Sequence, residues 1–459
     1  MQKDIIGTGN TSLFHHEIPP PSGLLKSLQY NWKRDLLAGL VVATISTSFS
    51  MGIARASGFP PVAGLFTAIV AGFLMIWLGG SNVTVSGPAA GLALALATGM
   101  DELGKVAHDP TQGYPLLLAS IVITGAIMCI LSMLKVAQYA HRIPTAVVDG
   151  MLAAIGIGII FKMLGDFFGL PFAARLHFWE IIYEIPSRIS QMNPRTFALG
   201  IVSLALVFGL PRFIAKIPGL HLIPSPAIVV VIGIIAGHSM GLEQQYLIQL
   251  PSDLFGSGIV HPNFSGLFSN AEVFWVGLKN ALILAAIDTV ESVVSVRGID
   301  KKDPCHRMSD VNRTLRSMGV LNILIALFFG GTTNLPGGIK STANIQAGGR
   351  TLWAGFFNAC FLLLFLVAGR SVINQIPLAT LAAVVMYAGF ALCKPAIWCE
   401  IIHEGRESVA IFTTTILMTL STDLVIGIGS GCALKLVLFG LKKVRTKSTT
   451  HLDDLAEAA

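Results

Sequence analysis

Long apolar stretches, separated by short polar or charged ones, follow one another along almost the whole chain from Leu36 onward. Most hold about 15 to 25 residues, which is enough for a helix to cross a hydrocarbon core about 30 Å thick. In lipid a chain must satisfy its own backbone hydrogen bonds, and helices do this within a single segment. The pattern therefore predicts an all-α membrane protein.

The apolar stretches divide into two sets of seven on either side of a polar stretch at 241–270. The fourteen predicted spans are 36–54, 61–78, 83–100, 115–135, 144–161, 196–213, 222–240, 273–296, 315–332, 336–348, 352–369, 376–392, 408–420 and 424–441. Because seven is odd, the second half would cross the membrane in the opposite direction to the first. We therefore predict a 7+7 inverted repeat.

The predicted domain organisation has three parts. A cytoplasmic N-terminal segment covers 1–35, and a transmembrane domain covers 36–443. Within it, repeat one occupies about 36–240 and repeat two about 273–443. Residues 444–459 are expected to form a short cytoplasmic tail.

Composition and charge support a membrane location. Hydrophobic residues make up 53% of the chain and charged residues only 12%, against about 25% charged in soluble domains. Lys and Arg gather in segments such as 297–316, which the topology places in the cytoplasm, as the positive-inside rule requires. The loop at 165–195 does not fit, because it is predicted to be external but is mixed in charge. The net charge of +6 thus follows from topology, and we expect no nucleic-acid partner.

Two of the predicted spans, the third and the tenth, are short and rich in Gly and Pro. Their sequences around 83–91 and 332–341 hold Pro88 and Pro336, which lie 248 residues apart. Interrupted segments at matching positions of two repeats are the best sequence indication of a transporter's binding site. We predict half-helices here, although Gly and Pro that only permit tight helix packing would give a similar pattern.

A half-helix that begins in the middle of the membrane directs unpaired N–H groups and a positive dipole end at its ligand. Two such ends facing one cavity would bind a small anion without any catalytic group. The residues predicted to bind the substrate are Ser86, Gly87, Ala89, Ala90, Gly91, Gly337, Gly338, Lys340 and Ser341.

Asp288 and Glu291 are the main ionisable residues deep inside a span, where each charge is costly. Their i, i+3 spacing puts both carboxylates on one helix face, and Ser292 joins them at i, i+4. Such a pair binds a cation, holds a proton or meets a basic residue. Lys340 is the candidate counter-charge, and a structural ion pair between the eighth and tenth spans is the alternative.

Five ordered motifs resemble the SulP family of sulfate permeases and related anion transporters. They lie at Arg34–Ala43, Gly58–Phe66, Ser86–Pro88, Glu291–Arg297 and Asn344–Thr351. The resemblance implies core and gate subdomains, with the substrate carried between half-helices three and ten by an elevator-like motion. It also implies a bacterial inner-membrane location and a homodimer. The family usually continues into a cytoplasmic STAS domain, which we do not expect within this sequence.

The resemblance also suggests how ions are coupled. Asp288 and Ser292 fill the places of the Na⁺ ligands of the sodium-dependent bicarbonate branch, and Gly338 is added as a putative third ligand. Glu291 matches a glutamate often assigned to proton coupling, and Lys340 occupies the place of an Arg near the anion. Na⁺ is the one possible cofactor. Ser48 and Phe49 stand where relatives often have Pro-Gln, so the substrate stays open.

The sequence thus predicts a secondary transporter of bicarbonate or sulfate driven by Na⁺ or H⁺. A dicarboxylate or nucleobase carrier of similar fold is an alternative, and so is a membrane scaffold or sensor that binds anions without transporting them. An intramembrane enzyme is disfavoured, because no HExxH or paired aspartyl motif lies in the spans.

Overall fold

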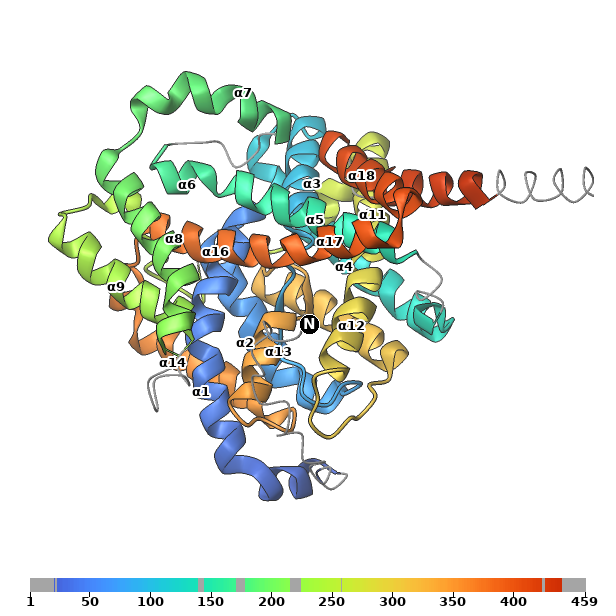
Figure 1. The fold of residues 1–459 in the computed structure, drawn as a ribbon, viewed down its shortest axis with the longest axis horizontal. Helices are drawn as coiled ribbons and strands as arrows, with labels where there is room; N and C mark the ends of the chain where they lie inside the picture. Colours follow the sequence, from blue (N-terminus) through green and yellow to red (C-terminus); the bar gives the residue numbers. More distant parts are fainter. Residues whose placement is uncertain are drawn as a thin grey trace, which may run out of the picture.

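A computed structural model describes residues 20, 23–138, 144–170, 178–214, 224–256, 258–422 and 426–439. The predicted tail at 444–459 and most of the predicted segment 1–35 lie outside these residues. The described residues are mostly helical (Figure 1). The helices of four or more residues are α1 (Leu24–Ala56), α2 (Pro61–Leu78), α3 (Ala93–Val106), α4 (Gly113–Met133), α5 (Thr145–Lys162), α6 (Leu164–Phe168), α7 (Phe178–Arg188), α8 (Pro194–Ile214), α9 (Ser225–Ser239), α10 (Phe264–Ser269), α11 (Ala271–Asp300), α12 (Val311–Phe329), α13 (Gly338–Gln346), α14 (Trp353–Ala368), α15 (Arg370–Ile373), α16 (Leu378–Leu392), α17 (Pro395–Glu404), α18 (Arg406–Ser421) and a last apolar helix, Ile426–Phe439.

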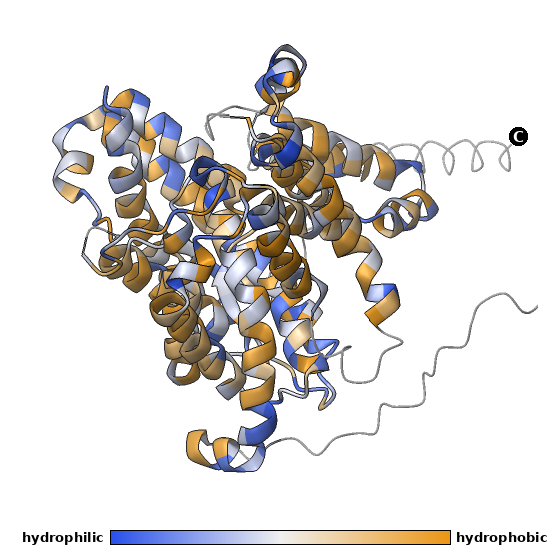
Figure 2. Ribbon diagram, turned by 90° about the vertical axis from the view of Figure 1, so that its left-hand side faces the viewer, coloured by the Kyte–Doolittle hydropathy of each residue, from blue (hydrophilic) through white to orange (hydrophobic). Residues whose placement is uncertain are grey.

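Hydrophobic residues make up much of the length of these helices (Figure 2). Seven helices are long and apolar enough to cross a membrane, and three shorter ones are also apolar, among the residues described. Large side chains such as Val202, Phe213 and Trp275 are more than half exposed on helices that carry few charges. Such a surface suits lipid rather than water.

The helices pack as two groups. Each group has eight helices, but those of the larger group contain more residues, 160 against 111. The larger group holds α1, α2, α3, α4, α11, α12, α13 and α14, and the smaller group holds α5, α6, α7, α8, α9, α16, α17 and α18. The groups meet mainly where α1 crosses α16, and there Gly52 brings the backbone of α1 against Val385. Leu92, Ile155 and Val385 share one buried apolar cluster that joins the two groups.

Glycines allow helices of the two sequence halves to approach closely at corresponding places. In the α4–α12 contact, Gly125 and Gly319 each lie against the other's carbonyl oxygen. In the α2–α14 contact, Gly72 lies against the carbonyl oxygen of Gly355. Each contact joins the second long helix of one half to the fourth span of the other. Small residues at such crossings are typical of helix packing in membranes.

The third and tenth predicted spans differ from the prediction. Each starts as a short strand, β1 (Ser86–Pro88) or β2 (Asn334–Pro336), before its helix begins. The strands pair antiparallel, with Gly87 opposite Leu335 at the centre. Helix α3 therefore starts at Ala93, after the interrupted segment at 83–91. Proline explains the change, because it disfavours a helical conformation in the residue before it and supplies no N–H to a helix.

Two further departures concern the connections. The predicted loop at 165–195 contains α6 and α7 among its described residues, and α17 lies between the predicted twelfth and thirteenth spans. Both α6 and α17 directly follow a helix of the smaller group, α5 and α16 respectively.

Candidate functional site

The β1–β2 pair brings together the two segments that the sequence singled out. The N-termini of α3 and α13 follow the strands, and neither is capped by a side chain. Hydrogen bonds between the halves fix this arrangement. Val85 N donates to Ser341 Oγ at 2.9 Å, and Asn344 Nδ2 donates to Val83 O at 2.9 Å.

Some of the predicted anion donors are already used by these contacts. Ala89 N donates to Thr333 O at 3.1 Å, and Gly337 N donates to Val85 O at 3.0 Å. The two N–H groups therefore hold the segments together and do not face a ligand. Ala90 is partly buried in the turn before α3, and Gly338 is exposed at the start of α13.

Lys340 of α13 is the cation at this site. Its side chain is buried, with 4% of its surface exposed. Nζ donates to Ser50 Oγ of α1 at 3.1 Å and lies against Gly87, where a Cβ would collide with it. An ammonium group has three donors, and this one makes a single hydrogen bond among the residues that the structure describes. Within the same residues, the buried Ser86 Oγ on the adjoining strand has no partner.

The expected ion pair between Lys340 and the acid pair is not formed. No carboxylate lies within 4.0 Å of the Lys340 ammonium among the ion pairs of the described residues. The prediction was wrong here because spacing along the sequence does not reveal that α1 supplies the neighbour of Lys340. A buried ammonium without a carboxylate partner is unfavourable in free energy unless another negative charge pairs with it.

Asp288 and Glu291 both face the protein interior. Asp288 is fully buried, accepting hydrogen bonds from Ser292 Oγ and Asn322 Nδ2, each at 2.9 Å. Asn322 Oδ1 in turn accepts from Asn334 N at 2.7 Å, which links the acid to β2. Glu291 lies directly against Gly91, and its Oε2 atom has no hydrogen-bond partner within the described parts of the chain.

The oxygen atoms around Asp288 suit a hard cation such as Na⁺, which binds carboxylate, hydroxyl and carbonyl groups. Glu291 Oε2 and Asn334 Oδ1 are buried without a hydrogen-bond partner among the described residues, as is expected of atoms that take part in binding. Gly338 is exposed and takes no part in the hydrogen bonds of Asp288 and Ser292. Asp288 and Ser292 would therefore hold the ion.

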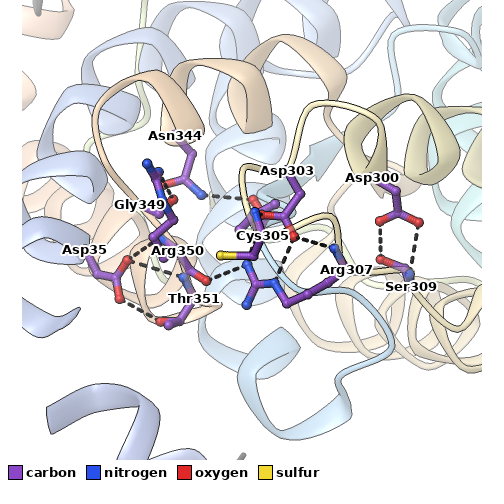
Figure 3. Close-up of polar contacts among 11 residues, drawn as sticks. Asp35, Asp300, Asp303, Cys305, Arg307, Ser309, Asn344, Gly349, Arg350 and Thr351 are labelled. Atoms are coloured by element: carbon purple, nitrogen blue, oxygen red, sulfur yellow. Dashed lines mark hydrogen bonds and ion pairs between the residues drawn. The ribbon is translucent and has the colours of Figure 1, made fainter. Parts of the chain in front are cut away.

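The sequence reading missed Asp35, a fully buried acid on α1. Its carboxylate accepts from Arg350 N at 2.8 Å and from Thr351 Oγ1 at 2.7 Å (Figure 3). Arg307 extends the network, since it pairs with Asp303 and donates from Nη2 to Arg350 O at 2.9 Å. Two of the sequence motifs are thus parts of one cluster that fixes the turn between α13 and α14. The polar residues inside these two motifs, Asp35 in one and Arg350 and Thr351 in the other, were the signal in the sequence that could have predicted the cluster.

A family model of the sulfate permease family matches residues 32–415, which include every residue of this site. The chain belongs to the sulfate permease family. Among its relatives is the bicarbonate transporter BicA of a Picosynechococcus strain, 24% identical over 92% of this chain and 74% of that protein. The putative sulfate transporter YvdB of Bacillus subtilis is also 24% identical, over 89% of this chain and 73% of its own length.

Solved structures show the same fold. The transmembrane domain of a cyanobacterial bicarbonate transporter BicA superposes with a TM-score of 0.75 at 20% identity, covering 86% of this chain and 97% of that one. Murine solute carrier 26 family member A9 in its inward-facing state gives 0.76 at 17% identity, covering 96% and 74%. The protein is therefore a multi-pass membrane protein of a transporter family, and its relatives are not enzymes.

Proposed function

We propose that this protein is a secondary active transporter of a small inorganic anion, with bicarbonate or sulfate as the substrate class. The observation that carries the proposal is Lys340, a buried ammonium with a hydroxyl partner and, among the described residues, no carboxylate partner. It lies where the two sequence halves meet, at β1 and the start of α13. An anion bound there would supply the missing charge.

Ser50 and Ser86 would complete the anion site. Ser50 Oγ contacts the Lys340 ammonium, and Ser86 Oγ, within the predicted site, has no hydrogen-bond partner among the described residues. Gly87 gives the anion access to backbone because it has no side chain. Phe49, which is buried in α1 next to Ser50, would make this side of the site apolar.

The acid pair would provide the coupling. Na⁺ would bind at Asp288 and Ser292, or a proton would reside on Glu291. Because Lys340 lies against Gly87 and Glu291 lies against Gly91, the two ions would bind on either side of one short turn. Opposite charges at short range in a medium of low dielectric stabilise each other, so each would promote the binding of the other.

The finer architecture belongs to the same proposal: fourteen spans in a 7+7 inverted repeat, with half-helices at spans three and ten. The antiparallel pairing of β1 with β2 and the matching glycine contacts of α4–α12 and α2–α14 support it. In an elevator-type motion, the larger helix group would be the core and the smaller group the gate. A homodimer with cytoplasmic termini in a bacterial inner membrane remains a prediction.

The proposal is tested by uptake of labelled bicarbonate, sulfate and fumarate into proteoliposomes, with and without gradients of Na⁺ and pH. We expect uptake of one of the inorganic anions that rises with one of the two gradients. Uptake of fumarate alone would favour the dicarboxylate carrier. Anion binding with no flux under any gradient would favour the sensor and refute transport.

A further inference from the structure

Arg55 and Arg297 occupy matching positions in the two sequence halves. They lie 242 residues apart, near the C-terminal ends of α1 and α11. The same separation relates Ser50 to Ser292, and these two serines both lie at the site. The two arginines are therefore counterparts, and in an inverted repeat they lie toward opposite faces of the membrane.

Arg55 closes one contact between the two helix groups. Its guanidinium pairs with Asp166 of α6 through two nitrogen atoms, with Nη2 to Oδ1 at 2.6 Å. The side chains are 36% and 16% exposed, so the pair is partly shielded from water. Because α1 belongs to the larger group and α6 to the smaller, this ion pair connects the groups.

Arg297 lies where the same two groups are separated by a cleft. It lines a cleft of about 510 Å³ between α11 and the start of α5, together with Lys301, Asp149 and Val294. The side chains of Arg297 and Lys301 make no ion pair or hydrogen bond in the part of the chain that the structure describes. Their neighbours differ, since Lys302 donates to Thr342 Oγ1 and Arg307 pairs with Asp303.

The smaller helix group carries acidic residues at this cleft and near it. Asp149 lies on α5, and Glu400 and Glu404 of α17 are close enough to interact with it electrostatically. Helix α17 follows α16 as α6 follows α5, so the acids of α17 correspond to Asp166. Each half thus has an arginine on the larger group and an acid on the smaller one.

We propose that Arg55 and Arg297 are positioning residues that form alternating latches between the two helix groups. Arg55 is paired with Asp166 while the cleft at Arg297 is open. When the cleft closes, Arg297 pairs with the acids of α5 and α17, and the Arg55 pair opens. This inference rests on the proposed transport function, since alternating access requires two states of similar free energy.

The test measures access to the cleft. A cysteine at Val294, in a full-length variant whose six native cysteines are replaced, is labelled in detergent with a polar maleimide. R55Q removes the closed latch and should shift the protein toward the closed cleft, slowing labelling about fivefold, at the lower end of typical coupling between states. Adding R297Q to R55Q should restore the rate, because both latches are then absent. The charge swap R55D/D166R should also restore it.

K279Q is the matched control, because Lys279 pairs with Glu102 within the larger group, at 3.2 Å between Nζ and Oε1. Unchanged labelling in R55Q, or equal slowing in K279Q, would overturn the latch. General misfolding of R55Q would not be reversed by a second charge removal, so the double variant separates the two explanations.

Anion flux by the wild-type protein is measured in parallel. If the wild type transports the anion but R55Q does not change the labelling rate, only the latch proposal is overturned. If R55Q slows labelling but the wild type shows no flux, the latch proposal holds and the transport proposal is overturned.

Discussion

Replacing Lys340 with methionine separates a binding role from a structural one. Methionine keeps most of the length of the side chain and removes the ammonium. In the structure Lys340 has 4% of its surface exposed and one hydroxyl partner, Ser50, at 3.1 Å. A buried charge without a counter-charge destabilises the fold, so its removal should leave the melting temperature unchanged or raise it.

Anion binding should respond in the opposite direction. Truncating one partner of a buried, hydrogen-bonded charge pair costs about 2 to 5 kcal/mol, so even the lower value weakens anion affinity about 30-fold. Thermal unfolding in detergent, with and without millimolar bicarbonate or sulfate, measures both effects, because a ligand of the folded state raises the melting temperature. We expect the wild type to be stabilised by its anion and K340M not to be.

Lys302→Met is the matched control. Lys302 is exposed, and it donates a hydrogen bond to Thr342, which lies on α13 as Lys340 does. It should retain the anion-dependent shift. The reasoning about Lys340 fails if K340M melts well below the wild type and still shows a full anion shift and normal uptake. Lys340 would then be structural.

Three further predictions concern neighbouring residues. Gly91→Ala should abolish uptake, because a Cβ at Gly91 would overlap the Glu291 carboxylate, whereas Gly209→Ala, with open space around it, should transport normally in the same uptake assay. Asp288→Asn should remove Na⁺ stimulation of uptake if Na⁺ is the coupling ion, and stimulation equal to that of the wild type would exclude this assignment. Asp35→Asn should lower the free energy of unfolding by about 1 to 3 kcal/mol. The two carboxylate oxygens accept from Arg350 N and Thr351 Oγ1, and an amide has only one oxygen, so one of these hydrogen bonds would be lost. An unchanged denaturation midpoint would contradict a stabilising role of the cluster.

The sequence by itself determined the class of the protein and the approximate location of its site. Repeated apolar stretches require helices in lipid, since no other local structure satisfies the backbone there. Pro88 and Pro336, 248 residues apart, marked the two interrupted segments that the structure brings together. The spacing of Asp288 and Glu291 also placed both acids on one face, and both are buried.

Only the tertiary structure decided which groups are partners. The strands at Ser86 and Asn334 form because each pairs with the other half of the chain, and a local pattern cannot show a partner 248 residues away. Lys340 meets Ser50 and not the acid pair because α1 packs against α13. Long-range contacts of this kind depend on how helices cross, and that is set by close packing at glycines such as Gly125 and Gly319 and by the pairing of buried polar groups.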